Sequence, residues 1–377
     1  MNISSERCWQ IAAGDTDRNY AEICLKHNVV IMGPGYCGDW LRVGENGESL
    51  AKENLLKRGI TSRKISTIER FVSSVMPGDL VVLRIGRSEV HGVGVVLSEY
   101  QYNELFADVD GWNLSHVHQV NWIWAKPDGT PKFFKDALNF GDTTQKIEPS
   151  NKKTKELFDW VNTLPEPDHV EVVPLQLPGA SIKPRDISNK LFDYGMASGS
   201  LSSLEDQIRD LGSLALWYKN YCKSPSESET VAHLVVPLLL SLGWTPQRIS
   251  LEYYQKGVGR ADLALFANGN RSDYEPVAMI EAKKFGNSCL TAEEQVRKYA
   301  EGMSYVRRLV VTDGIRYGIF VREDNNPFPV TPNAYLNLTD LRDNYPVYGD
   351  CAGADESMLF LSAAWSHRFL HPSNPSV

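Results

Sequence analysis

Two acids and a lysine stand in this sequence at spacings that suit metal-dependent hydrolysis of a phosphodiester. Glu281, Ala282 and Lys283 are consecutive, and Asp262 precedes Glu281 by 19 residues. Paired carboxylates hold a hard divalent cation through oxygen, and such a cation polarises a phosphate and lowers the pKa of its bound water. A neighbouring lysine orients or deprotonates that water, or stabilises the negative charge that develops at phosphorus. These residues predict a site for Mg²⁺, with Mn²⁺ as the alternative cation.

The elements that must position these residues are strands flanked by helices. Residues 260–266 and 276–283 are apolar runs of strand length, and each contains one of the two acids. A helix is expected before them over 226–242, where Pro237 should kink it or cost about 3 kcal/mol. Another helix is expected after them over 291–303. Further strands are expected at 249–253, 308–312 and 317–320, which gives a mixed αβββαβ core.

Further motifs surround the acids and the lysine between about residues 225 and 322. They are Glu227, Pro237-Leu238-Leu239, Leu242-Gly243-Trp244, Glu252, Gly259-Arg260-Ala261-Asp262, Ile280-Glu281-Ala282-Lys283-Lys284, Gln295-Val296-Arg297-Lys298-Tyr299 and Val311-Thr312-Asp313-Gly314. This stretch resembles the nuclease domain at the start of the restriction subunit of type I restriction enzymes, within the PD-(D/E)xK superfamily. The family's aspartate often follows a proline, whereas here it follows Ala261. The resemblance implies a restriction-endonuclease-like fold and cleavage that leaves a 5′-phosphate.

The resemblance also implies a role for each matching residue. Asp262 and Glu281 would ligate Mg²⁺ together with a backbone carbonyl near Ala282, and Lys283 would act on the attacking water. Glu227 would point from its helix toward a metal-bound water.

A glutamine and a tyrosine on the next helix complete the implied site. Gln295 would contact the scissile strand or the lysine. It lies one turn from Tyr299, because residues i and i+4 share a helix face.

Each of these assignments has a plainer alternative. Asp262 could end a turn and pair with Arg260, and the paired lysines could form a solvated strand end. Glu227 could serve only as a cap that suits the helix dipole, with Glu229 in the catalytic role instead. Gln295 and Tyr299 could be packing residues.

The first 163 residues have a different character, with many Gly, Trp and Val residues and short apolar runs between turn signals. Strands this short and this closely spaced indicate a small β-barrel with helices. The expected strands are 29–32, 80–85, 92–97 and 117–124, and the expected helices are 66–75 and 155–164.

Aromatic residues gather near the Gly-rich turns of this first part. Trp9, Tyr36 and Trp40 are candidates for the wall of a pocket, with Asp39 as a polar contact and Trp122 on a strand. The pattern resembles the PUA superfamily, and within it the EVE and YTH-like branch. That resemblance implies a pocket for a modified base, where stacking on aromatic rings supplies about 1–3 kcal/mol per base.

The aromatic candidates also have plainer alternatives. Asp39 could be a turn residue, and core packing is expected for at least one of Trp122 and Trp124. His116 and His118 are equally compatible with surface positions and with ligand contacts.

Several prolines between the two parts indicate a linker. Within it, residues 203–221 have the apolar spacing of an amphipathic packing helix. The expected fold is therefore α+β in the first part and α/β in the last. The expected domains are a sensor over 1–163, a linker and helix over 164–223, a nuclease over 224–345 and a tail over 346–377.

The composition limits the function classes. A formal charge of −8 argues against a protein that coats polyanions nonspecifically. The six cysteines show no zinc-ligand spacing, and no apolar run reaches the roughly 18 residues of a membrane span. The first residues do not form a signal peptide. We therefore expect a soluble, cytoplasmic protein with reduced thiols and no membrane partner.

Taken together, these features predict a modification-dependent DNA endonuclease of bacterial restriction or antiviral defence. It would act without ATP, since no Walker A pattern is present, and would cut both strands as a homodimer or in two binding events. One alternative is an effector nuclease activated by a small nucleotide ligand bound to the first domain. Another is a noncatalytic nucleic-acid-binding protein, and RNA remains an alternative substrate.

Overall fold

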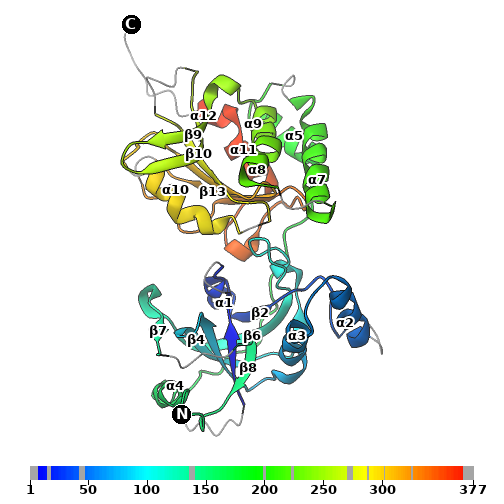
Figure 1. Ribbon diagram of the computed structural model, residues 1–377, viewed down its shortest axis with the longest axis vertical. Helices are drawn as coiled ribbons and strands as arrows, with labels where there is room; N and C mark the ends of the chain where they lie inside the picture. Colours follow the sequence, from blue (N-terminus) through cyan, green and yellow to red (C-terminus); the bar gives the residue numbers. More distant parts are fainter. Residues whose placement is uncertain are drawn as a thin grey trace. The chain divides into compact units, whose positions relative to one another are not determined.

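The chain folds into two units, residues 1–177 and residues 178–377, each compact on its own (Figure 1). The structure is a computed structural model. It describes residues 7–14, 18–41, 47–135, 141–197, 201–221, 225–269, 275–286, 288–300, 302–323 and 326–367.

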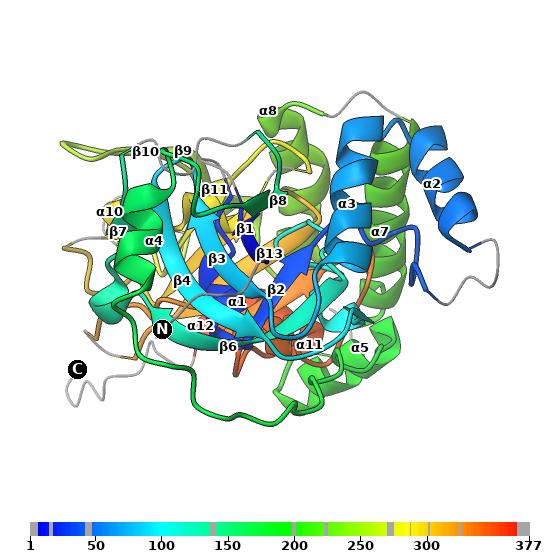
Figure 2. The same ribbon diagram turned by 90° about the horizontal axis from the view of Figure 1, so that it is seen from below.

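The first unit is built on one curled, half-barrel sheet. Its strands are β1 (Cys8–Ala12), β2 (Val29–Met32), β3 (Leu80–Ile85), β4 (Glu89–Val96), β5 (Gln101–Tyr102), β6 (His116–Ala125), β7 (Lys132–Phe133) and β8 (Thr144–Ile147). Its helices are α1 (Ala21–Lys26), α2 (Gly47–Lys57), α3 (Ser62–Ser74) and α4 (Lys155–Val161). The strand order is β2-β6-β4-β3-β1-β8, and only β1 and β3 run parallel along this path. In Figure 2, α3 and α4 flank this sheet on opposite sides.

Apolar side chains at alternate strand positions explain how the sheet is covered. Leu80 and Val82 of β3 point to the same face, and they cluster with Val93 of β4. Leu157 and Phe158 of α4 complete that cluster, so the terminal helix closes one face of the sheet. The predicted hairpin of β3 and β4 is confirmed by their antiparallel pairing.

The second unit contains a mixed six-stranded sheet in the order β14-β13-β12-β11-β10-β9. Its strands are β9 (Ile249–Gln255), β10 (Gly259–Leu265), β11 (Ala278–Ala282), β12 (Arg308–Thr312), β13 (Arg316–Val321) and β14 (Ala334–Asn337). Its helices are α5 (Pro184–Asp193), α7 (Leu204–Tyr221), α8 (Glu227–Thr230), α9 (Val236–Ser241), α10 (Glu293–Ala300), α11 (Ala354–Leu361) and α12 (Ala363–His367). Among the pairs formed by these six described strands, only β11 and β12 run parallel.

Helices cover both faces of this sheet. Ile280 of β11 and Leu263 of β10 lie in one core with residues of α5, α7, α9 and α11. On the other face, α10 places the Arg297 guanidinium over the Phe320 ring of β13 at 5.2 Å. Figure 1 shows α10 separate from the group formed by α5, α7 and α9. The sheet is therefore the middle layer of three.

A π-helical turn comes just before Pro237, the residue at which a kink was predicted. Residues Val231–Val235 are π-helical and join α8 to α9, and the Val236 N–H donates to the Val231 carbonyl. A π turn adds one residue to the helix, which shifts the hydrogen-bond ladder just before the proline that cannot donate to it. The helix therefore continues through Pro237.

The second unit begins earlier in the chain than the predicted nuclease domain. Leu204, Ile208 and Leu211 of α7 are buried in its core with Leu238 of α9, which confirms 203–221 as a packing helix. This unit also includes α5, α11 and α12. Among the described residues, no helix is both long and apolar enough to cross a membrane.

Candidate active site

The register of β10 and β11 places the two predicted metal ligands side by side. Leu263 pairs with Ile280, so one step further along the strands Asp262 lies opposite Glu281. The Ala282 N–H donates to Asp262 Oδ2 at 2.7 Å and locks the two strand ends together. Side chains directly opposite on neighbouring strands share one face of the sheet. The antiparallel pairing of β10 and β11 therefore brings the two acids together although 19 residues separate them in sequence.

Glu281 is a buried carboxylate with one oxygen paired and one not. The residue is 3% exposed, and its Oε1 accepts a hydrogen bond from Lys283 Nζ at 3.2 Å. Its Oε2 is buried and has no hydrogen-bond partner among the described residues. Burial, reinforced by the charge of Asp262 and offset by Lys283, raises the pKa of Glu281 to about 7. A buried, unpaired carboxylate oxygen is costly unless a cation or donor reaches it.

Lys283 is held by a chain of hydrogen bonds that continues onto α10. Its backbone N–H donates to the Thr312 carbonyl at 2.7 Å, and its Nζ donates to Gln295 Oε1 at 3.0 Å. Gln295 Nε2 then donates to the Tyr299 hydroxyl at 3.0 Å. The predicted glutamine–lysine contact is therefore present, and the alternative in which Lys283 is a solvated strand end does not describe this arrangement.

Tyr299, at the end of this chain of hydrogen bonds, packs closely against a glycine of the β9–β10 hairpin. Gly259 has a φ of +141°, and a Cβ added there would lie 3.2 Å from Cε1 of Tyr299. Tyr299 itself is 7% exposed. Tyr299 is thus both a packing residue and the hydrogen-bond partner of Gln295.

Glu227 and Glu229 have separate roles at the start of α8. Glu229 forms the capping box, because its Oε2 accepts from the Ser226 N–H at 2.7 Å while its own N–H donates to Ser226 Oγ. The pKa of Glu227 is raised by partial desolvation and by the charge of Asp262, and is lowered by Lys283. Glu227 is therefore the acid of α8 that is electrostatically linked to the carboxylates and the lysine.

Arg260 pairs with Glu252 and not with Asp262. Its Nη1 donates to Glu252 Oε2 at 2.8 Å. Glu252 has a φ of +49°, and it stands opposite Asp262, at the one position where the β9–β10 ladder has no paired residues. Burial raises the pKa of Asp262, the Ala282 N–H and Lys283 lower it, and Glu252 raises it further.

Asp262 and Glu281 fit a divalent cation whose remaining ligands are water molecules or the substrate phosphate. Within the described part of the chain, no group of three or more His, Cys, Asp or Glu side chains gathers as a metal site. Mg²⁺, however, is commonly held by one or two carboxylates and completes its shell with water and substrate phosphate. The unpartnered Oε2 of Glu281 and the hard oxygen donors on both strands match that need.

In the first unit, three of the five predicted pocket residues lie together on the segment after β2. Tyr36 is 47% exposed, and the Arg58 guanidinium lies over its ring at 5.3 Å. Asp39 accepts a hydrogen bond from the Leu41 N–H, as a turn residue does. Trp40 is 2% exposed, and its Nε1 has no partner among the described residues.

Trp9 and Trp122 lie elsewhere in the first unit. Trp9 is 5% exposed, and its indole N–H donates to Asp79 Oδ2 at 2.8 Å, so it holds β1 to the turn before β3. The Trp122 ring lies over Gly92 and Gly94 of β4. Trp122 lies six residues along β6 from His116, which contacts Trp40, a separation of roughly 20 Å.

A bulge explains why Trp122 and Trp124 face opposite ways although they are two residues apart. Val93 pairs with Trp124 and Gly94 pairs with Trp122, so Ile123 is an extra residue in β6. Trp124 packs edge-on against Trp160 of α4 at 5.0 Å. The expectation that at least one of the two tryptophans packs in the core is met by Trp124.

His116 and His118 are not surface residues, since both are fully buried. His116 contacts the Tyr100 hydroxyl through Nδ1 at 2.8 Å and the Pro34 carbonyl through Nε2 at 3.2 Å. Burial lowers the pKa of His116 to about 4. These contacts pin the segment that carries Tyr36 and Trp40. The polar contacts of the two histidines are made with residues distant in sequence, so no local sequence pattern predicts that the histidines are buried.

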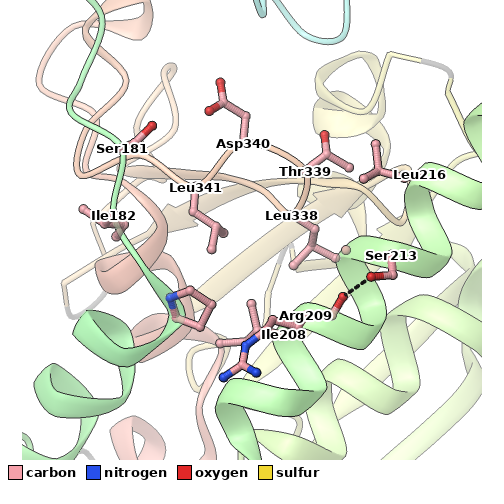
Figure 3. Close-up of a pocket in the computed structure, with 12 residues that line it drawn as sticks. Ser181, Ile182, Ile208, Arg209, Ser213, Leu216, Leu338, Thr339, Asp340 and Leu341 are labelled. Carbon is pink, nitrogen blue, oxygen red and sulfur yellow. Dashed lines mark hydrogen bonds between the residues drawn. The ribbon is translucent and has the colours of Figure 1, made fainter.

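A groove of about 450 Å³ lies between α5, α7 and residues 338–341 (Figure 3). None of the candidate catalytic residues lines it. Its two charged residues already have partners, since Arg209 pairs with Glu205 and Asp206 and Asp340 accepts from Arg342. We therefore assign no ligand to this groove.

A family model with the description Domain of unknown function (DUF8426) matches residues 9–146. The match lies within the first unit and includes the predicted pocket residues. It covers less than half of the chain, and its description states no activity. No curated protein matches the chain.

Proposed function

We propose that this protein is a Mg²⁺-dependent DNA endonuclease whose first unit, PUA-like in character, senses a modified base and whose second unit, a PD-(D/E)xK nuclease core, cuts nearby. The observation that carries the proposal is the buried, unpartnered Oε2 of Glu281 opposite Asp262, with Lys283 Nζ 3.2 Å from the other oxygen. Three acids with raised pKa values beside a lysine are typical of a functional site. A modification-dependent restriction enzyme of bacterial antiviral defence fits this combination.

The residues would divide the reaction among them. Asp262 and Glu281 would hold Mg²⁺, which when bound would polarise the phosphate and acidify water. Lys283 donates two hydrogen bonds, to Glu281 and to Gln295. An ammonium group has three donors, so one remains for the water or for the charge on phosphorus. Tyr299 holds Gln295 and so keeps Lys283 in place.

The direct test is cleavage by the purified full-length chain with Mg²⁺. The substrates are matched duplexes that carry cytosine, 5-methylcytosine, 5-hydroxymethylcytosine or a glucosylated base. We expect cleavage of at least one modified duplex and little cleavage of the plain one. Lys283→Ala should lower the single-turnover rate on the order of 10²- to 10⁴-fold, because it removes the donor next to Glu281. Lys284→Ala, the exposed neighbour, is the matched control and should keep the rate.

The outcomes separate this proposal from its alternatives. If all duplexes stay intact with Mg²⁺ and with Mn²⁺, the proposed activity is wrong. Cleavage of plain DNA only after a nucleotide is added would instead indicate an effector nuclease. Binding without cleavage, unchanged in Lys283→Ala, would indicate a noncatalytic nucleic-acid-binding protein. Cleavage of RNA alone would reassign the substrate.

A further inference from the structure

Beyond the catalytic residues, the β9–β10 hairpin carries an exposed aromatic–arginine pair next to the carboxylates. Tyr254 and Arg260 are directly opposite in the ladder. Arg260 precedes Asp262 by two residues, so the two side chains share a face of the sheet. Tyr254 is 65% exposed, and the Arg260 side chain is 60% exposed. An arginine and an aromatic ring therefore lie one row of the sheet away from the proposed cutting site.

The Arg260 guanidinium is aimed at the acidic row by Glu252. The row runs across three strands as Glu252, Asp262 and Glu281, and the Glu252 carboxylate holds Arg260 at 2.8 Å. That ion pair is largely solvated, since the Glu252 side chain is 71% exposed. Exposed pairs contribute only about 0–1 kcal/mol. A stronger anion can therefore replace Glu252 as the partner of Arg260.

The negative charge around the carboxylates explains why a nuclease would need a further positively charged side chain here to hold DNA. Asp262 and Glu281 lie opposite each other and Glu227 interacts with both electrostatically, so their negative charges repel a polyanion. Lys283 is already engaged with Glu281 and Gln295. A guanidinium binds phosphate through two parallel hydrogen bonds, and an exposed tyrosine ring offers a face on which a base stacks.

We infer that Arg260 and Tyr254 bind the substrate strand beside the scissile phosphate: Arg260 takes the neighbouring phosphate in place of Glu252, and Tyr254 stacks on the adjoining nucleotide. This inference rests on the proposed nuclease function and adds a binding site to it. Arg260 and Tyr254 are binding residues and not catalytic ones, so their loss should weaken the affinity for the substrate strand.

The experiment measures the half-saturating DNA concentration and its salt dependence for the full-length chain with Mg²⁺, on the duplex that the wild type cuts best. Arg260→Ala should raise that concentration about tenfold or more, because a hydrogen bond to a charged group is lost. The slope of log affinity against log salt concentration is negative, and it should become less steep by about 0.9, the value for one phosphate contact. Arg260→Lys should keep the slope, since it keeps the charge.

Tyr254→Ala should raise the half-saturating concentration between about fivefold and a hundredfold, the range expected for one stacking contact, without changing the slope. The matched controls are Arg209→Ala and Tyr305→Ala. The Arg209 side chain is 61% exposed and ion-paired like Arg260, and Tyr305 is 64% exposed like Tyr254. Both controls should behave as the wild type does.

The inference and the proposed function fail in different ways. If the wild-type chain cuts no nucleic acid, the proposed function is wrong and the inference falls with it. If the wild type cuts but Arg260→Ala keeps the wild-type slope and half-saturation, as Arg209→Ala is expected to, only the inference is overturned. A lower melting temperature for Arg260→Ala with an unchanged slope would assign Arg260 a structural role and overturn the inference as well.

Discussion

Burying Glu281 with one unpaired oxygen opposes folding over part of the pH range. Its pKa in the folded chain is raised to about 7 from an ordinary 4.5, so the folded state binds more protons than the unfolded state between these values. Stability must then fall as pH rises from about 4.5 through 7, and the full cost is present above 7. A pKa difference of this size corresponds to roughly 3 kcal/mol.

Glu281→Gln removes this cost because the side chain can no longer ionise. We expect the variant to melt several degrees above the wild type at pH 8.5, with a much smaller difference at pH 5, by calorimetry without Mg²⁺. Mg²⁺ should raise the wild-type melting temperature at pH 8.5 and leave that of Glu281→Gln nearly unchanged. Equal differences at both pH values would contradict the assignment of the raised pKa to this residue.

Among the elements, the β9–β10 hairpin offers a matched pair of glycines. Gly257 and Gly259 both have positive φ, but only Gly259 has Tyr299 within 4 Å of an added Cβ. Both alanine variants should lose on the order of 1 kcal/mol of stability from backbone strain. Only Gly259→Ala displaces Tyr299 and so disturbs Gln295 and Lys283. It should lower the single-turnover rate on the order of tenfold to a hundredfold.

Urea unfolding and single-turnover cleavage of both variants separate the two effects. Equal rates for Gly257→Ala and Gly259→Ala would show that Tyr299 does not support the lysine.

At the scale of the whole molecule, two separately compact units predict that recognition and cutting can be separated by mutation. Tyr36→Ala removes the exposed ring that Arg58 covers. We expect it to reduce the preference for modified over plain DNA by about fivefold to a hundredfold, the range for one stacked base. The maximal cleavage rate should not change. Phe133→Ala, which removes a 63% exposed ring of the same unit, is the control.

A loss of maximal rate in Tyr36→Ala, with the preference intact, would place Tyr36 outside base recognition.

Short apolar runs bounded by turns were enough to predict five of the six strands described in the second unit and four of the eight described in the first. β2, β3 and β12 have the predicted boundaries, because Val, Ile and Leu runs are both strand-forming and buried. β14 was not predicted, since the four residues Ala334–Asn337 carry no alternation. The second unit starts at Pro178 because α5 and α7 bury apolar faces against α9 and α11. This packing joins segments distant in sequence, so the prolines before them indicate only a linker.

The spatial grouping of the two acids and the lysine was easier to predict than that of the aromatic residues, for a physical reason. Asp262, Glu281 and Lys283 lie on paired strands whose register brings them together. Trp9 and Trp40 are apolar rings that serve equally well in a core, and both are buried. The bulge at Ile123 is invisible in the sequence because it depends on the partner strand.

The left-handed backbone of Glu252 bears on how this protein can be engineered. A glutamate at φ +49° costs about 1–2 kcal/mol that glycine would not, so any search for thermostable variants will favour Glu252→Gly. That substitution also frees the Arg260 guanidinium and removes a carboxylate from beside Asp262. Thermostability selected without an activity screen will therefore alter the charge balance at the place where the chain is proposed to meet DNA.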